Sequence, residues 1–345
     1  MSASQLVAQA AAVLEGALTL RRGDEVLIVW DETVTADLVE ALRCAAITSG
    51  IRPYVFTYQP LAYRPMAEFG LFAGASLPPG GVRIPAGLAG ALASCPVIAF
   101  ATSDLDFLMF APPFKDILAG GTRVVSLSYL TTESAMRLLP GSLEEVEALR
   151  ACTDEGGSLM AKAKKVCVTS PAGTDLVLEL GDYTAKIHNG VVAKGARQSL
   201  PGGQVSRVPN DGTANGTIVI DRSIAANDFK QLGEPVRFIV EDGYVTKVEG
   251  DLEAAKLGRW LARHDDREIY HLTELAFGTN PRCRLSGVAA PCEDTHTTGC
   301  VSVALGADVH IGGRVMAPAH IDMTMRDATL ELDAHAVVKD GALAF

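Results

Sequence analysis

A histidine and an aspartate stand two residues apart near the end of this 345-residue chain, as His320 and Asp322. On a β-strand, residues two apart point to the same face, so this imidazole and this carboxylate would share one side of a sheet. Together they can bind one divalent cation. The flanking Ile321 and Met323 would point into a hydrophobic core on the other side. The spacing therefore predicts two ligands of a metal site on a C-terminal strand.

Other polar residues that can hold a metal crowd into the same quarter of the chain. They lie in three segments, IYHLTELAFGTNP (269–281), CEDTHTTGCVSVALG (292–306) and PAHIDM (318–323). Glu293 and Asp294 can approach a metal, although we favour a solvated acidic turn. For His296 and His310 we favour surface turns over ligands. His188, in AKIHNG, is expected in a loop, either solvated or as a substrate contact or base.

The first part of the chain alternates between apolar strands and helical stretches. The run EVLIVW from Glu25 predicts a strand, residues 35–48 an amphipathic helix, and YVFTY from Tyr54 the next strand. The pattern recurs along this region, which predicts a parallel, doubly wound α/β sheet. The Gly120-Gly121 pair fits a turn between helix and strand, because it lacks the spacing of a dinucleotide-binding fingerprint.

A connector helix is expected after this region. Ser142 followed three residues later by Glu145 forms a capping box, which predicts a helix over residues 143–164. A break at Gly156 and Gly157 is expected as an alternative to one continuous helix.

Beyond the connector, short β-rich runs are separated by Gly, Asp and Pro. FIV-EDG-YVTKV predicts a hairpin, because Asp-Gly supplies the turn between alternating strands. A helix is expected over residues 252–263, with Leu257, Trp260 and Leu261 on one face. We therefore predict a Rossmann-like α/β domain with connector helix (residues 1–165) and a mainly antiparallel β (α+β), metal-binding domain (residues 166–345).

Composition favours a small-molecule substrate. The net charge is −11 and no basic stripe is present, which argues against nucleic acid or an anionic membrane as a partner. No run approaches the roughly 20 apolar residues of a membrane span, and the first residues do not fit a signal peptide. The seven cysteines are odd in number and widely spread along the chain, which fits a reducing compartment. We expect a cytoplasmic protein that forms a homo-oligomer.

Four blocks, in order, resemble the C-terminal domain of the thermophilic aminopeptidase family (aminopeptidase T type). They are LPGGQVSRVPNDGTANGTIVID (200–221), HLTELAFGTNP, TTGCVSVALG and GG...PAHIDM. The fold of that family also hosts the mononuclear iron enzyme 2,5-dihydroxypyridine 5,6-dioxygenase. The resemblance covers about residues 200–325 by motif and the whole chain by layout.

The resemblance implies a set of metal ligands, part of which this chain retains. Glu274, His320 and Asp322 match ligands of the aminopeptidases, whereas Gln204 and Ser302 stand where a glutamate and a histidine are expected. An amide and a hydroxyl are poor replacements for those ligands. Three ligands suit one metal with open positions. Gln204 and Ser302 would then line the site and hydrogen-bond a polar substrate edge.

Two departures separate this chain from the dioxygenase. A histidine stands there at the position of Glu274, and another stands just before the LP turn, where this chain has Ser199. His271 is a candidate for the second imidazole. It lies three residues from Glu274, however, so on a regular strand the two side chains would face opposite ways.

The resemblance leads to a first hypothesis of ring-opening dioxygenation of a small, hydroxylated N-heteroaromatic compound. Fe(II) is the metal expected, with Zn and Mn as other candidates, and Gln204, Ser302 and His188 would orient the ring. The alternative is an aminopeptidase-type metallohydrolase, in which Glu274 serves as ligand and base. A third hypothesis is a binding protein without metal. Phe107 in SDLDFLMFAPPF is expected either to stack on a flat ring or to pack internally, as is Phe110.

Overall fold

The computed structural model of the chain describes residues 3–31, 35–58, 84–102, 112–127, 130–226, 229–286 and 293–345. These residues form two compact units. Unit 1 contains the described residues before Cys152 together with His188–Gly202, and unit 2 contains Cys152–Ile187 and the described residues from Gly203 onward. The boundary after residue 165 stays a prediction.

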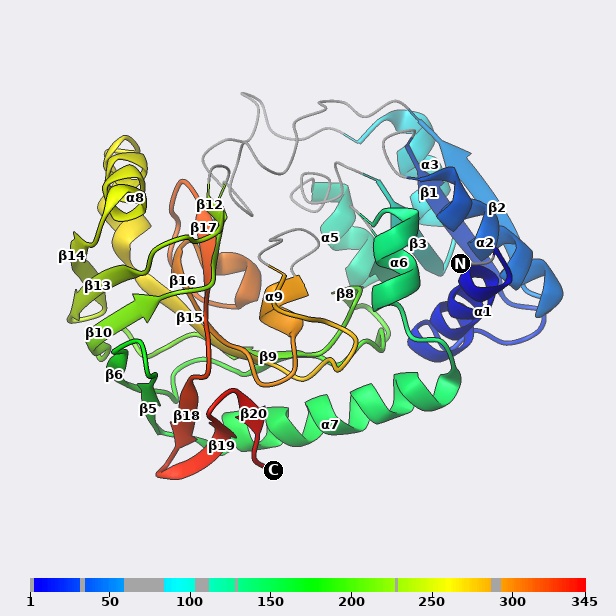
Figure 1. The fold of residues 1–345 in the computed structure, drawn as a ribbon. Helices are drawn as coiled ribbons and strands as arrows, with labels where there is room; N and C mark the ends of the chain where they lie inside the picture. Colours follow the sequence, from blue (N-terminus) through cyan, green and yellow to red (C-terminus); the bar gives the residue numbers. More distant parts are fainter. Residues whose placement is uncertain are drawn as a thin grey trace. The chain divides into compact units, whose positions relative to one another are not determined.

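Unit 1 is built on a five-stranded parallel sheet with the order β2-β1-β3-β4-β8 (Figure 1). Its strands are β1 (Glu25–Trp30), β2 (Arg52–Thr57), β3 (Val97–Ala101), β4 (Arg123–Ser126) and β8 (Arg197–Ser199). The helical segments are α1 (Ala3–Ala12), the π-helix η1 (Val13–Ala17), α2 (Ala36–Thr48), α3 (Ala86–Ser94), α5 (Pro112–Ala119), α6 (Thr132–Leu138) and α7 (Leu143–Lys162), which continues into unit 2. The predicted parallel α/β sheet is confirmed.

The central strands of this sheet are buried, as a parallel sheet requires when helices cover it. β3 is buried at every position, and Phe100 packs with Leu92 of α3 and Phe114 of α5 in one hydrophobic cluster. The turn between α5 and β4 forms at Gly120-Gly121, as predicted, and Gly121 has a φ of +94°, which a glycine adopts without strain.

α7 begins where predicted, with the Ser142 half of the capping box formed, and it runs without the break considered from the sequence. The amide of Glu145 donates to Ser142 Oγ at 3.3 Å, and the Glu145 carboxylate accepts from the amide of Gly141 at 2.7 Å. A Cβ at Gly156 would lie 2.9 Å from Phe277, and one at Gly157 only 2.4 Å from Ile187. The glycines therefore let the helix approach these side chains closely instead of interrupting it.

Unit 2 contains two sheets whose strands pair antiparallel. One has eight strands in the order β14 (Tyr244–Glu249), β13 (Val236–Glu241), β10 (Asn215–Ile220), β6 (Asp175–Glu179), β5 (Lys165–Thr169), β18 (Thr329–Leu332), β19 (His335–Lys339) and β20 (Ala342–Leu343). The other, here called the site sheet, has the order β12 (Phe229–Gln231), β11 (Ser223–Ala226), β17 (His320–Met325), β16 (Val301–Gly306), β15 (Leu272–Gly278), β9 (Gln204–Arg207) and β7 (Lys186–His188). The predicted antiparallel β region is confirmed.

Both local predictions for this region are also confirmed. Asp242 and Gly243 have positive φ values in the turn of the β13–β14 hairpin. Helix α8 (Leu252–Ala262) buries the three apolar residues expected on one face. The remaining helical segments are η4 (Arg267–Tyr270), α9 (Glu293–His296) and η5 (Val309–Ile311).

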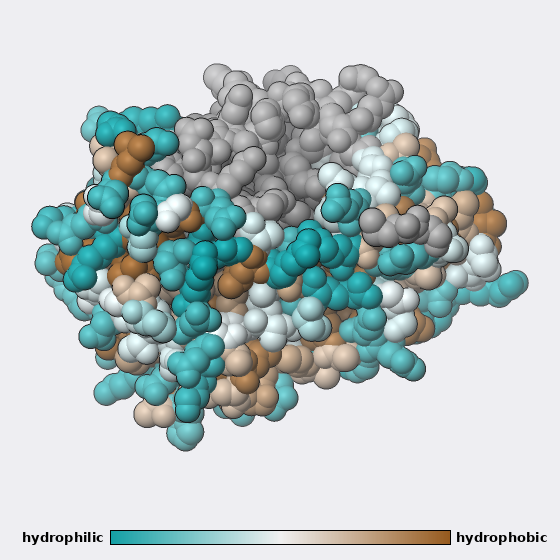
Figure 2. All heavy atoms as spheres, in the orientation of Figure 1, coloured by the Kyte–Doolittle hydropathy of each residue, from teal (hydrophilic) through white to brown (hydrophobic). Residues whose placement is uncertain are grey.

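One hydrophobic core joins the two sheets of unit 2. It contains Phe238 of β13 together with Leu275 of β15 and Met323 of β17. On the face of the molecule seen in Figure 2, hydrophilic and hydrophobic residues are interspersed. Among the described residues, no helix is long and apolar enough to span a membrane.

Candidate functional site

Three neighbouring strands of the site sheet bring the predicted ligands together. Ala304, on the middle strand β16, pairs with Glu274 of β15 on one side and with Asp322 of β17 on the other. His320 pairs with Gly306, two residues further along β16. Side chains of directly paired residues share a face, as do residues two apart on one strand. The strand register therefore gathers two carboxylates and one imidazole on one face.

The polar atoms of the three side chains lie close enough to share one cation. His320 Nε2 is 3.2 Å from Glu274 Oε2 and 3.4 Å from Asp322 Oδ1. One ligand atom from each residue lies within 4.8 Å of the other two. Glu274 and His320 are buried, whereas the Asp322 side chain is 15% exposed. Asp322 is therefore the most exposed of the three side chains.

The opposite face of the site sheet belongs to the hydrophobic core. Residues that alternate with the cluster along the same strands all join that core, namely Leu275, Phe277, Val301, Val303, Leu305, Ile321, Met323 and Met325. We call the face with the cluster the polar face. Period-two alternation thus sends the ligands and the core residues of each strand to opposite sides.

Small residues make room for the cluster on the polar face. Ala304 and Gly306 stand on β16 between the ligand-bearing strands, so β16 itself adds no large side chain beside the ligands. A Cβ at Gly306 would lie 2.0 Å from the carbonyl oxygen of Ala319, and Gly306 has a φ of +96°. Only glycine fits this position.

A backbone carbonyl holds the orientation of His320. Its Nδ1 lies 2.7 Å from the oxygen of Ala307, so Nδ1–H donates to that carbonyl and Nε2 is left to face the carboxylates. Burial by itself lowers the pKa of His320, but the charges and hydrogen bonds of Asp322 and Glu274 outweigh it and raise the pKa to about 10. The site therefore favours a positive charge between the two carboxylates.

The donor set fits a divalent metal ion. Two carboxylates and one imidazole keep a net negative charge even when the imidazole is protonated, and a cation would balance it. His320 has the second hydrogen bond that metal-binding histidines usually make. Three protein donors leave coordination positions open, which catalysis at a metal requires.

A model of the family described as 2,5-dihydroxypyridine 5,6-dioxygenase matches residues 5–345. This chain belongs to that family. The 2,5-dihydroxypyridine 5,6-dioxygenase of Pseudomonas putida is 28% identical to it over 247 residues, which are 69% of each chain.

Two solved structures share the fold of this dioxygenase-family chain. The 2,5-dihydroxypyridine dioxygenase from Pseudomonas putida matches with a TM-score of 0.80 at 22% identity and covers 100% of this chain and 98% of its own. Wild-type AmpT from Thermus thermophilus matches with a TM-score of 0.65 at 15% identity and covers 99% of each chain. The resemblance predicted from the four sequence blocks is confirmed for both relatives.

Family membership decides between the reaction classes predicted from the sequence. A ring-cleaving dioxygenase is confirmed over the aminopeptidase-type hydrolase, and the family implies a metal cofactor and a small-molecule substrate. The structure adds a cluster able to hold that metal.

The loop that follows β16 in this dioxygenase-family chain is folded around Asp308. Its Oδ1 accepts a hydrogen bond from the amide of Val315 at 2.6 Å, and its backbone oxygen accepts from the amides of Ile311 and Gly313. A Cβ at Gly313 would lie within 2.4 Å of the Asp308 carboxylate oxygens, so this position requires glycine. Burial raises the pKa of the Asp308 carboxyl to about 6.

His310, in the same loop, packs against the cluster. Its ring meets the ring of His320 edge to face, with centroids 4.5 Å apart. The expectation of a surface turn was incomplete, because this contact half-buries the side chain. His310 is not among the described residues whose ligand atoms form the cluster.

The α9 segment corrects three sequence interpretations. Glu293, Asp294 and His296 are all buried, so neither a solvated acidic turn nor a surface histidine is present. Asp294 accepts hydrogen bonds from the Ser223 hydroxyl at 2.7 Å and from the amide of Ser286 at 2.7 Å. Tertiary packing of α9 on β15 and β17 causes this burial, and within the described residues the acidic pair does not join the metal-ligand cluster.

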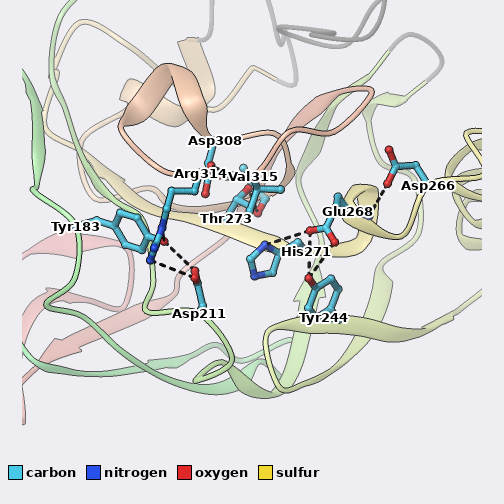
Figure 3. A network of polar contacts seen from close by, with 11 residues as sticks. Tyr183, Asp211, Tyr244, Asp266, Glu268, His271, Thr273, Asp308, Arg314 and Val315 are labelled. Carbon is cyan, nitrogen blue, oxygen red and sulfur yellow. Dashed lines mark hydrogen bonds and ion pairs between the residues drawn. The ribbon is translucent and has the colours of Figure 1, made fainter.

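His271 lies beside the cluster without joining it. A bulge between Leu272 and Glu274 adds a residue to β15 relative to β16, so counting along a regular strand does not apply here. The His271 ring stacks on Tyr244 with centroids 4.6 Å apart, and Nδ1 lies 4.0 Å from the Glu268 carboxylate (Figure 3). Burial lowers the pKa of His271. The imidazole is therefore engaged in a neighbouring polar network.

Gln204 and Ser302 both lie on the polar face. Ser302 stands two residues before Ala304 on β16, and Gln204 starts β9, where it pairs with Gly278 of β15. Both are buried. Their common face with the cluster supports the predicted roles in substrate binding, which stay proposals.

The sequence also offers His188, Phe107 and Phe110 as candidate substrate contacts. The expectation that His188 lies in a loop is wrong, because it pairs as the last residue of strand β7, and its role as a contact or base stays a prediction. Phe107 and Phe110 lie outside the described residues.

Sequence reasoning missed two groups that the structure brings to the site. Ser206, two residues after Gln204, shares its face, and alternation along QVSR would have found it. The Ala307 carbonyl contacts His320, but a backbone acceptor leaves no signal in the sequence.

Proposed function

We propose that this chain is a mononuclear Fe(II)-dependent dioxygenase that opens the ring of a small, hydroxylated N-heteroaromatic compound, with Glu274, His320 and Asp322 as ligands. The observation that carries the proposal is the clustering of these side chains in a chain of the dihydroxypyridine dioxygenase family. When bound, Fe(II) would supply the redox and Lewis-acid chemistry that joins O₂ to the ring.

The side chains of the polar face bind and orient the substrate. The amide of Gln204 and the hydroxyl of Ser302 can each donate and accept hydrogen bonds, which suits a ring with hydroxyl and nitrogen substituents. Ala304, between the ligand-bearing strands, adds only a methyl group beside the cluster. His320 keeps its Nδ1 proton on the Ala307 carbonyl throughout, so that Nε2 stays directed at the metal position.

Fe(II) is the proposed metal because the family is one of dioxygenases, although the donors also suit Zn and Mn. The purified protein should contain about one iron per chain. Metal-free protein loaded under argon with Fe(II), Mn(II) or Zn(II), and then given air and 2,5-dihydroxypyridine, should consume O₂ only with Fe(II). Turnover with Mn(II) or Zn(II) alone would overturn the metal assignment, and no O₂ uptake with any hydroxypyridine would overturn the function.

A cytoplasmic location and a homo-oligomeric state belong to the same proposal. Light scattering during size-exclusion chromatography should give a mass that is two or more times that of the 36.3 kDa chain. A monomeric mass would contradict the oligomer.

A further inference from the structure

A row of small residues crosses the site sheet next to the cluster. It runs over five strands through pairs of directly opposed residues, in the order Ser206, Ala276, Ser302, Thr324 and Ser223. Ala276 stands two residues from Glu274 on β15, and Thr324 stands two residues from Asp322 on β17. The row therefore lies about 7 Å from the cluster along the strands. We call it the hydroxyl row. It shares the polar face with the proposed metal ligands.

One end of the hydroxyl row is saturated with hydrogen bonds. The Ser223 hydroxyl lies 2.6 Å from that of Thr324 and donates to the Asp294 carboxylate at 2.7 Å. α9 therefore covers this end and satisfies its polar groups. Within the described residues, the Ser223 hydroxyl is therefore fully used by the protein itself.

The other end of the hydroxyl row differs. Ser206 is 1% exposed, and its Oγ has no hydrogen-bond partner within the described part of the chain. The residue opposite, Ala276, offers only a methyl group. Native proteins rarely bury a hydroxyl without a partner, because the lost hydrogen bonds to water are not replaced.

The orientation of Ser206 is fixed by its neighbours on β9. Val205 joins the hydrophobic core, and the Arg207 guanidinium donates to the carbonyls of Tyr183 and Met160. Both therefore occupy the opposite side of the strand, which leaves Ser206 on the face of Glu274. The Ser206 hydroxyl therefore lies on the same face as Ala276, its partner on β15.

We propose that the Ser206 hydroxyl binds a polar substituent of the ring substrate and is a specificity-determining residue of the site. The inference rests on the proposed function. A hydroxyl both donates and accepts, so it matches a ring hydroxyl or its oxo tautomer. With one substituent near the metal position and another at Ser206, the site would select rings that are polar at two separated positions.

Substituting Ser206 tests this inference through binding and stability together. Anaerobic titration of the Fe(II)-loaded protein with 2,5-dihydroxypyridine should give a Kd about three- to tenfold weaker for Ser206→Ala than for wild type. The Tm of the ligand-free variant should be unchanged or higher, because the substitution removes a hydroxyl that has no partner in the folded chain. Metal content should stay the same.

Ser223→Ala is the matched control from the saturated end of the same row. It removes two hydrogen bonds and should lower the Tm without changing Kd. A second arm compares 2-hydroxypyridine and 3-hydroxypyridine, each lacking one substituent of the probe. For one of them, Ser206→Ala should bind as well as wild type, because that ligand has no group for Ser206 to contact.

Three results would overturn the inference. An unchanged Kd for 2,5-dihydroxypyridine with Ser206→Ala would show that the hydroxyl does not meet the substrate. A lowered Tm with equal weakening of all three ligands would assign Ser206 a structural role. If wild type binds no dihydroxypyridine, the proposed function fails and this inference with it, whereas wild-type binding together with an unchanged variant removes the inference alone.

Discussion

The two faces of the site sheet are built by the same strands and are both buried, yet they carry opposite chemistry. On the core face, Leu305 and Ile321 pack against the second sheet of unit 2. On the polar face, their neighbours Gly306, His320 and Asp322 form or flank the cluster. Burial therefore does not mark a hydrophobic core here. The alternation of each strand separates the residues that stabilise the fold from those that bind.

The two faces also differ in how their groups are satisfied. Apolar side chains on the core face need only close packing, which the second sheet provides. Polar side chains on the other face need partners, and Ser223 and Asp294 have them, whereas the Ser206 hydroxyl has none in the described part of the chain and the cluster keeps a net negative charge. A metal ion and a polar substrate would supply what is missing.

The largest expected effect comes from removing a ligand on the polar face. Asp322→Ala should abolish metal binding and activity. The loss should exceed the roughly 10–100-fold loss of metal affinity or activity that is typical when a residue hydrogen-bonded to a metal ligand is replaced. The Tm measured with chelator should stay near that of wild type, because this carboxylate adds little to the core. Elemental analysis measures the metal content, and thermal unfolding measures the Tm. Glu331→Ala, in the other sheet, should keep its metal, and an Asp322→Ala protein that also keeps it would place the site elsewhere.

The adjacent residue should behave in the opposite way. Ile321 is 1% exposed on the core face, so Ile321→Ala should lower the free energy of unfolding by about 2–5 kcal/mol, while Ile321→Val should cost about 0.5–1.5 kcal/mol. The folded protein should still bind one metal ion. Denaturant unfolding and metal analysis check the two parts. Loss of metal from folded Ile321→Ala would mean that the faces are not separable.

A smaller effect is expected from pH at the edge of the polar face. Burial raises the pKa of Asp308 to about 6, so the folded chain disfavours its charged form. This group contributes stability below its unfolded pKa near 4, and that contribution is lost as pH rises through about 6. Asp308→Asn should therefore gain stability relative to wild type between pH 4 and pH 7 in metal-free protein. Denaturant unfolding of both proteins across this pH range measures the difference. A stability difference that does not change with pH would contradict the raised pKa of Asp308.

The smallest expected effect adds a charge to the polar face. Gln204→Glu places a carboxylate at the position where the aminopeptidase motif predicts a ligand, and it should raise the affinity for a second divalent ion. Calorimetric titration with Mn(II) should show a second, weaker site beside the first. Gln198→Glu, from unit 1, is the control and should add no such site. One site in both variants would remove Gln204 from the surroundings of the metal.

Local patterns in the sequence were sufficient for the elements and for part of the site. The His-x-Asp spacing predicted that His320 and Asp322 share a face, and the Asp-Gly turn of the β13–β14 hairpin formed as expected. Both depend on backbone geometry within a few residues. The resemblance between blocks added Glu274, which no local period connects to the other two ligands.

Only the tertiary structure decided the rest, because register and burial arise from contacts between distant segments. Pairing with Ala304 of β16 brings Glu274 and Asp322 onto one face. A bulge in β15 alters the direction expected for the His271 side chain. Packing of α9 buries Asp294, which by composition suits a solvated turn, and the pairing of β9 with β15 leaves Ser206 buried without a hydrogen-bond partner in the described chain. The sequence by itself determined which residues could do chemistry, and strand pairing determined which of them meet.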